Sequence, residues 1–354
     1  FISKTLLKLL VQIGLKNLIS GKPIEKKQSI TEFDFLKYRN PALLLSWMIV
    51  GIGLFSVYQN QDKILGIDFR GGEELIVSFD EMVEPAKIDE LFSQNNDIGE
   101  VQHVYRSEVG TGEDASRLVL QTEPEKSAQA LALLQEKFPA NGLSVEDGGG
   151  ETAISGSVSE QIKYDAILSV LVALLGILLY VAVRFEMGYA IGAVAATIHD
   201  VLMTIGLFVL LGTLSGGTIC SGQFTAPMLA SVLMIVGYSI IDTIVVFDRI
   251  REELEMNPVT NLRKIITIAI NRVLSRSIIT SVTTLLAAVS LWVFGAGVIN
   301  DFAFIFVIGI LTGTFSSVFI ASPIFFLWHK GDRKHVEEGE MLPKYDWHTS
   351  STKD

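Results

Sequence analysis

One aspartate lies deep in an apolar stretch of the chain. The stretch reads IVGYSIIDTIVVFDRI, and Asp242 lies in it about two helical turns before Asp248 and Arg249. An ionisable side chain at membrane depth is costly, so it generally faces a partner or a path for water. Two interpretations stay open: Asp242 takes up and releases protons, or it is paired inside a helix bundle and only fixes the packing.

An arginine further along the chain is the candidate cation for this carboxylate. Arg276 lies in NRVLSRSIITS, with Arg272 one turn before it and Thr280 and Ser281 just beyond it. The alternative is that the arginine only anchors its helix at the membrane surface, as basic residues on the inner side commonly do. The two hydroxyl groups are suited to hydrogen-bonding water along a proton path.

A second polar pair, His199 and Asp200, lies in the middle of another apolar run. Adjacent residues of a helix point to different faces, so we expect the two side chains to have different partners. The pair is interpreted either as a proton relay or as polar packing, and it is a weaker candidate than Asp242.

The sequence excludes several other kinds of chemistry. It contains no P-loop, HExxH, GxSxG or dinucleotide-binding motif, so we expect no nucleotide hydrolysis and no enzyme activity. The single cysteine, Cys220, excludes an internal disulfide and any multi-cysteine metal site, and we expect it outside the membrane, where it offers a single labelling position. We expect no metal, no cofactor and no nucleic acid. An ion gradient remains as the energy source, since one charge crossing the membrane potential gains about 2.3 kcal/mol per 100 mV.

Composition identifies the elements that must position these residues. Of the 354 residues 49% are hydrophobic and only 19% are charged, with a mean hydropathy of +0.43. Six apolar runs approach or exceed the length of about 20 residues that crosses a bilayer. They cover residues 41–59, 166–183, 188–211, 227–247, 278–295 and 302–328. The GxxxG spacings Gly188–Gly192 and Gly309–Gly313 predict close helix crossings.

The distribution of charge predicts how the six spans are oriented. Residues 1–40 hold 8 basic and 3 acidic residues, and residues 248–277 hold 6 and 4. Residues 60–162 hold 7 basic and 21 acidic residues, while the loops 212–226 and 296–301 have no Lys or Arg. Because short cytoplasmic loops retain Lys and Arg, both termini are expected in the cytoplasm and the acidic domain outside.

The acidic domain has its own pattern of strands and helices. Strands are predicted over residues 73–80, 101–107, 116–122 and 143–147, and helices over residues 85–95 and 124–138. The order β-α-β-β-α-β predicts an α+β ferredoxin-like fold. It has no apparent catalytic set, so we interpret it as a binding or gating module.

These patterns divide the chain into five parts. They are a basic arm or linker (1–40), a first span (41–59), an extracytoplasmic domain (60–163), a proton-conducting bundle of five spans (164–328) and a cytoplasmic tail (329–354). The segment FISKTLLKLLVQIGLKNLIS is either a basic amphipathic helix on the inner membrane surface or the end of a span from a longer parent chain.

Three motifs give the chain a family resemblance. The first is FDFLKYRN followed by GIDFRGG, which contains Asp68, Gly71 and Gly72. The second is HDV at residues 199–201, and the third is VGYSIIDTIVVFDRIREE, which starts at Val236, contains Gly237 and runs on into NRVLSRSIITSVTTLL. Over residues 33–328 the chain resembles the SecF proteins of the SecD/SecF family of bacterial protein-export membrane proteins.

The resemblance implies a fold and a function. It implies a polytopic α-helical membrane protein related to the proton-driven multidrug exporters, in the bacterial cytoplasmic membrane. It implies that the protein uses the proton motive force to drive preprotein translocation together with SecD, separate or fused, and the SecYEG channel. It assigns the proton path to Asp242 and Arg276 and leaves a further carboxylate to the SecD half. The N-terminal segment resembles the end of SecD, which indicates a SecDF fusion as the parent chain.

One departure and two rival functions accompany this resemblance. Ile241 stands where the family has asparagine, so an amide is missing beside Asp242. The rivals are a passive translocon scaffold, whose polar residues only fix packing, and a small-molecule proton antiporter of the same superfamily. The small acidic domain argues against the antiporter because it leaves little room for a substrate pocket.

Overall fold

The computed structural model describes twelve stretches of the chain. They are residues 33–61, 64–79, 83, 85–95, 102–107, 116–139, 143–145, 152–184, 186–217, 219–257, 260–295 and 298–332. The described residues from Asp34 onward belong to one compact unit. Most of the expected basic arm and of the tail lies outside the described residues.

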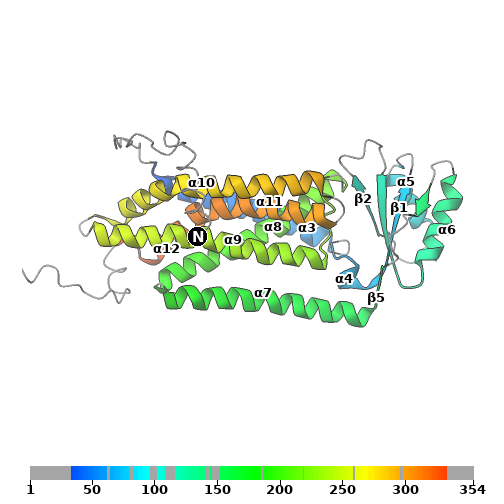
Figure 1. Ribbon diagram of the computed structural model, residues 1–354, viewed down its shortest axis with the longest axis horizontal. Helices are drawn as coiled ribbons and strands as arrows, with labels where there is room; N and C mark the ends of the chain where they lie inside the picture. The colour runs from blue at the N-terminus through cyan, green and yellow to red at the C-terminus, as the bar shows by residue number, and fades with distance from the viewer. Residues whose placement is uncertain are drawn as a thin grey trace, which may run out of the picture. The chain divides into compact units, whose positions relative to one another are not determined.

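Six helices within these residues are long and apolar enough to cross a membrane, which confirms the predicted number. The first is α3 (Arg39–Gln59) with the short η1 (Phe35–Tyr38) before it. The next four are α7 (Gly156–Arg184), α8 (Met187–Ser215), α9 (Ala226–Met256) and α10 (Leu262–Phe294). The sixth span consists of α11 (Val298–Ser316), a π-helical turn η4 (Ser317–Ala321) and α12 (Ser322–Trp328). Figure 1 shows the long helices running alongside one another.

Local sequence signals account for where the long helices begin and end. Gly216 takes the left-handed conformation (φ 59°) that stops α8. The Asn261 side chain accepts a hydrogen bond from the Lys264 amide at 2.8 Å and caps α10. Pro227 lies in the first turn of α9, where its missing amide hydrogen costs nothing.

Small residues set the distances between the helices. A Cβ on Gly309 would lie 2.2 Å from Ile235, and one on Gly313 would lie 3.2 Å from the Ser239 Cβ, so both glycines pack against α9 as their spacing predicts. Gly192 packs in the same way against the carbonyl oxygen of Ala321 at 2.9 Å. The sixth span is therefore in close contact with both α8 and α9.

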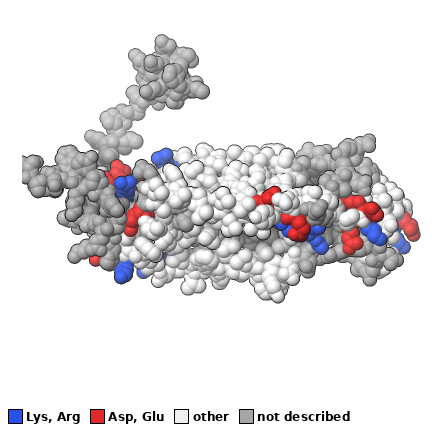
Figure 2. Space-filling model, turned by 90° about the horizontal axis from the view of Figure 1, so that it is seen from below, with Lys and Arg blue, Asp and Glu red and all other residues white. Residues whose placement is uncertain are grey.

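The outward faces of the helices are apolar and the charges lie toward the ends. Ile167, Leu171, Leu175 and Leu179 of α7 are all exposed by more than half. On the face shown in Figure 2, the helical part has a broad band without Lys, Arg, Asp or Glu. A lipid environment accommodates such a band because it demands no hydrogen bonds from the side chains.

A sheet domain follows the first span. Its strands are β1 (Gly72–Phe79), β2 (Gln102–Ser107), β3 (Ser116–Thr122), β4 (Ser144–Val145) and β5 (Thr152–Ile154). The sheet has the antiparallel order β2-β3-β1-β4, with β5 also paired to β1. Helices α5 (Pro85–Ser93) and α6 (Ser127–Lys137) pack on the face formed by alternating residues such as Leu75, Val77 and Phe79.

Two details of this domain differ from the prediction. Strand β5 was not predicted, because its three residues are too short for a periodic signal. Helix α6 begins three residues after the predicted position, since Glu125 takes a positive φ of 66° that is incompatible with a helix. The Glu73 carboxylate on β1 holds this turn by accepting hydrogen bonds from the Glu125 amide (2.7 Å) and the Ser127 amide (3.2 Å).

The segment between α3 and β1 joins the sheet to α9. Leu65 and Phe224 form an isolated parallel bridge. In the short helix α4 (Ile67–Arg70), the Asp68 carboxylate accepts a hydrogen bond from the Ala226 amide, the first residue of α9, at 2.8 Å. A carboxylate at a helix N-terminus accepts a hydrogen bond from an otherwise unpaired amide and interacts favourably with the positive end of the helix dipole. The helix that contains Asp242 therefore starts on a segment that leads directly into the sheet.

Candidate functional site

Asp242 lies in the middle of α9, where two serine hydroxyl groups hold its carboxylate. The Ser277 hydroxyl of α10 donates to Oδ1 at 2.6 Å, and the Ser317 hydroxyl of the π turn donates to Oδ2 at 2.7 Å. The side chain is only half-buried. Each carboxylate oxygen therefore has one hydroxyl donor, from a different helix. Partial exposure leaves the group accessible from the surface of the bundle.

Asp200 is held in the same way but is completely buried, with 0% of its surface exposed. Its Oδ2 accepts hydrogen bonds from the Ser239 hydroxyl of α9 and the Ser316 hydroxyl of α11, each at 2.6 Å. Its Oδ1 lies 3.2 Å from Nδ1 of His199. A buried carboxylate is tolerated when its oxygens are satisfied by donors, as here.

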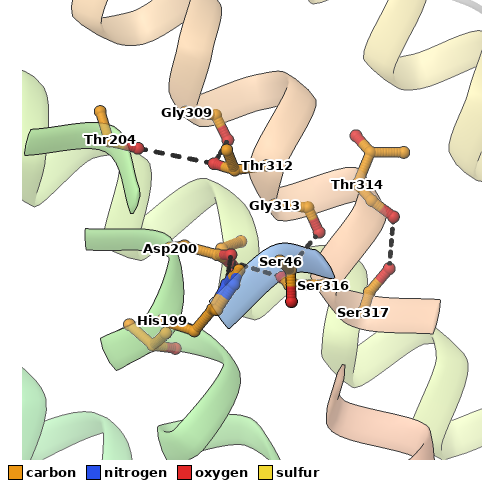
Figure 3. A network of polar contacts seen from close by, with 12 residues as sticks. Ser46, His199, Asp200, Thr204, Gly309, Thr312, Gly313, Thr314, Ser316 and Ser317 are labelled. Atoms are coloured by element: carbon orange, nitrogen blue, oxygen red, sulfur yellow. Dashed lines mark hydrogen bonds and ion pairs between the residues drawn. The ribbon is translucent and has the colours of Figure 1, made fainter. Parts of the chain in front are cut away.

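The serines that reach the two carboxylates from the sixth span are consecutive residues. Ser316 ends α11 and Ser317 begins the π turn, and Figure 3 shows Ser316 beside Asp200 and Ser317 turned toward Thr314. Each hydroxyl has a second acceptor in its own helix: the carbonyl oxygen of Gly313 for Ser316 and that of Thr314 for Ser317, both at 3.1 Å. Short π-helical turns occur frequently at functional sites.

His199 and Asp200 contact one another, which the prediction of different partners did not include. The two side chains have different further contacts: serines for Asp200, and for His199 an edge-to-face contact with Trp47 of α3 at 5.5 Å between ring centroids. Nε2 of His199 is buried and has no hydrogen-bond partner among the described residues. The two side chains therefore form a contact that is fully buried inside the helix bundle.

Arg276 is not brought into contact with Asp242. Its side chain is exposed, and its guanidinium group makes no hydrogen bond or ion pair with another described residue. Its neighbour Ser277 takes the position facing Asp242, and consecutive helix residues point about 100° apart. Ile241 is 65% exposed and also points away from the serine network.

Thr280 and Ser281 differ in what they contact. The Thr280 hydroxyl donates back to its own helix, with the carbonyl oxygens of Arg276 and Ser277 both at 3.0 Å. The Ser281 hydroxyl lies 2.7 Å from that of Thr314 and 3.1 Å from that of Tyr238. Ser281 thus belongs to a hydroxyl cluster that joins α9, α10 and the sixth span.

The far end of α9 from the sheet contains an ion-pair network that sequence reasoning missed. Glu253 is completely buried and pairs with both Arg249 (2.5 Å) and Arg272. Arg249 also pairs with Glu252, whereas Asp248 is exposed. The four-residue spacing of Arg249 and Glu253 on one helix was the available signal. The network fixes α9 to α10 at this end.

The glycines of the first motif are required by the backbone. Gly71 and Gly72 have φ values of 77° and 126°, and a Cβ on Gly72 would lie 2.4 Å from the Thr122 carbonyl oxygen. Gly237 is different, because a Cβ there would meet nothing within 4 Å. Asp68, which caps α9, and the two glycines Gly71 and Gly72 therefore give the first motif a structural role.

Cys220 lies in the loop between α8 and α9 and is not the labelling position that was expected. Its side chain is 2% exposed and its thiol donates to the Phe208 carbonyl oxygen at 3.5 Å. Burial, together with the negative charge of Asp301, raises the pKa of the Cys220 thiol to about 12. Within the described residues no cluster of three His, Cys, Asp or Glu side chains is placed to hold a metal ion.

The geometry defines a class of protein: a multi-pass membrane protein with carboxylates at membrane depth and a sheet domain attached to one of its spans. Residues 144–331 match the family described as Protein export membrane protein SecD/SecF, C-terminal. The chain is 36% identical to the protein translocase subunit SecF of Thermodesulfovibrio yellowstonii over 85% of its length and 96% of the relative. It is 35% identical to SecF of Calditerrivibrio nitroreducens over 86% of its length and 96% of the relative.

Two solved structures have a similar fold. One is SecDF, a translocon-associated membrane protein, from Thermus thermophilus, with a TM-score of 0.70 and 27% identity. The other is SecDF in the super-membrane-facing form, with a TM-score of 0.57 and 28% identity. The matches cover 84% and 86% of this chain but only 39% and 40% of the SecDF chains. This chain belongs to the SecF family of integral membrane subunits of the bacterial protein-export translocase.

Proposed function

We propose that the chain is a proton-coupled subunit of the Sec translocase, in which Asp242 takes up and releases protons to drive preprotein movement. The observation that carries this proposal is the environment of Asp242. It is a half-buried carboxylate at membrane depth with a serine donor on each oxygen and no cation in contact among the described residues. Such a group is costly to keep in the hydrocarbon, and an ionisable residue that persists there commonly serves a function.

The two serines give Asp242 a defined response to protonation. An ionised carboxylate accepts from both hydroxyl groups, whereas a protonated carboxyl donates one hydrogen bond of its own. Ser317 has a second acceptor, the Thr314 carbonyl oxygen at 3.1 Å, to which its hydroxyl can turn. Protonation of Asp242 therefore changes the contacts between α9 and the π turn of the sixth span.

The partners are proposed from the family and from the exposed face around Asp242. Ile241, Ile278 and Ile279 are exposed by 65%, 48% and 62%. This apolar face, with Arg276 on it, fits against a SecD partner, separate or fused, that supplies a further carboxylate to the proton path. The complex would act on a preprotein at the SecYEG channel.

The proposed orientation follows the basic residues. The network of Arg249, Arg272 and Glu253 lies at the end of α9 far from the sheet, and that end is proposed to face the cytoplasm. Both termini are then cytoplasmic and the acidic sheet domain is extracytoplasmic, in the bacterial cytoplasmic membrane. The strand order β2-β3-β1-β4 supports a ferredoxin-like fold for that domain.

The test is proton-gradient-dependent release of a preprotein from vesicles that contain this chain with its SecD partner. Asp242→Asn keeps the shape of the side chain and removes its proton exchange. Release is expected to collapse in this variant while the complex still assembles. The matched control is Asp165→Asn, which removes an exposed carboxylate that contacts only Gln161 of the same helix among the described residues.

Two outcomes would overturn the proposal. If Asp242→Asn releases preprotein at the wild-type rate, the carboxylate only fixes packing and the scaffold function takes its place. If Asp165→Asn impairs release as strongly, the loss follows from removing any carboxylate from the complex.

A further inference from the structure

Asp200 holds two elements together, and these are the elements that meet at Asp242. Its Oδ2 accepts from Ser239, which lies on α9 one turn before Asp242, and from Ser316, which directly precedes Ser317. The contact between Asp242 and Ser317 joins the same two elements. One fully buried oxygen atom thus fixes α9 against the sixth span next to the candidate proton site.

The packing around this oxygen leaves little room for adjustment. A Cβ on Gly313 would lie 3.2 Å from the Cβ of Ser239, so α9 and α11 are in contact one turn before the serine pair. The π turn begins at Ser317, and the Ser322 hydroxyl donates to its carbonyl oxygen at 3.0 Å. Consecutive residues share one backbone, so a rotation that takes Ser316 off Asp200 also moves Ser317.

The groups that face the two carboxylates are few. Asp200 contacts His199 on its own helix, and Trp47 of α3 makes an edge-to-face contact with the His199 ring. The contacts of Asp200 from α9 and the sixth span are serine hydroxyls. Asp242 contacts serines of α10 and of the π turn, and the exposed Arg276 makes no ion pair with it. Ser316 and Ser317, which are neighbours along the backbone, therefore each donate to one of the two carboxylates.

We infer that Asp200 is a positioning residue for Asp242: its buried carboxylate clamps α9 and the sixth span through Ser239 and Ser316, and thereby keeps the Ser317 hydroxyl on Asp242. Ser316 makes no hydrogen bond to Asp242, so an effect of Ser316 on Asp242 must pass through the packing of the sixth span against α9. The inference rests on the proposed function for its importance, but the geometry can be tested separately.

The experiment measures the hydrogen bonding of Asp242 directly. Isotope-edited infrared spectra of the chain with its SecD partner are recorded with labelled aspartate, and the spectrum of the same protein with Asp242→Asn is subtracted in each background. The carboxylate band that remains belongs to Asp242, and its frequency depends on the hydrogen bonds that it accepts. Ser317→Ala, which removes a direct donor, gives the reference shift.

The expected result concerns residues that do not touch Asp242. Ser316→Ala is expected to shift the band in the same direction as Ser317→Ala, while Ser316→Thr restores the hydroxyl and the wild-type band. Asp200→Asn is expected to act like Ser316→Ala. The matched control is Thr312→Val, which removes a buried hydroxyl one turn earlier in the same helix, where it contacts Thr204 and the Gly309 carbonyl oxygen. This control is expected to leave the band unchanged.

The outcomes separate this inference from the proposed function. A band that shifts in Ser317→Ala and not in Ser316→Ala overturns the positioning role, whatever happens to preprotein release. A band that shifts equally in Thr312→Val also overturns it, because any lost hydroxyl would then suffice. If Ser316→Ala shifts the band but Asp242→Asn releases preprotein normally, the clamp stands and the proton-carrying function fails.

Discussion

A glycine contact between α3 and α8 gives the sharpest prediction for the assembly of the bundle. Gly53 of α3 and Gly206 of α8 face each other with almost no space between their backbones. A Cβ on Gly53 would lie 2.7 Å from the Cα of Gly206 and 2.8 Å from its carbonyl carbon. The variant Gly53→Ala is therefore expected to push α3 away from α8.

The size of the effect follows from these distances. Non-bonded carbon atoms prefer separations of about 3.5–4.0 Å, so α3 must withdraw by about 1 Å. Overpacking of this kind costs about 1–3 kcal/mol, and alanine returns up to about 1 kcal/mol as the better helix former. We expect a net loss of about 1–2 kcal/mol, which lowers the midpoint of thermal unfolding of a 354-residue chain by about 1–3 °C.

The assay is thermal unfolding of the purified complex, and the same helix provides the control. Gly51 lies two residues away, where a Cβ would meet nothing within 4 Å, so Gly51→Ala is expected to unfold at the wild-type temperature or slightly above. Gly206→Ala should behave like Gly53→Ala. Equal unfolding temperatures for Gly53→Ala and Gly51→Ala would refute the reasoning that backbone contact at this point positions α3.

Two further predictions concern groups outside the spans. Burial and the charge of Asp301 raise the pKa of Cys220 to about 12, so little of the reactive thiolate is present near pH 8. A maleimide is therefore expected to label the folded protein far more slowly than the denatured one, and equal labelling rates would contradict the burial of this thiol. Hydrogen bonds from the Glu125 amide and then from Ser127 hold the pKa of Glu73 below its ordinary value, so its stabilising contribution is present at neutral pH and is lost as the pH falls through the lowered pKa. Wild type should therefore exceed Glu73→Gln in unfolding temperature at neutral pH by a small margin that disappears in strong acid, and a margin that grows in acid would show that the sign is wrong.

The sequence was a good guide wherever a residue type is unusual for its surroundings. An aspartate in an apolar run is rare, so the sequence singled out Asp242 and Asp200, and in the structure serine hydroxyls donate to both within helices long and apolar enough to cross a membrane. The spacing of Gly309 and Gly313 predicted a close crossing, and both glycines pack against α9. The alternation of apolar residues placed the main strands of the sheet within two residues of their observed ends at most positions.

The sequence did not indicate which side chains contact the two aspartates, because these contacts depend on which helices pack together in the bundle. Four serines, at positions 239, 277, 316 and 317, donate hydrogen bonds to the two aspartates. A serine in a membrane helix commonly bonds to its own backbone, so its presence in the sequence does not predict such a contact. The widening of the helix at Ser317 is likewise not encoded in a recognisable pattern. Arg276 was paired with Asp242 because both are charged, whereas the turn of α10 presents Ser277 to Asp242 instead.

The cap on α9 has a mechanical consequence. Ala226 bonds to Asp68, and Gly72 begins the interior strand of the sheet four residues after Asp68. Asp242 lies 16 residues along the same uninterrupted helix, a rod of about 24 Å at 1.5 Å per residue. An axial displacement of α9 would therefore reach the sheet by a short route: the hydrogen bond from Ala226 to Asp68 and the few residues that lead from Asp68 into β1.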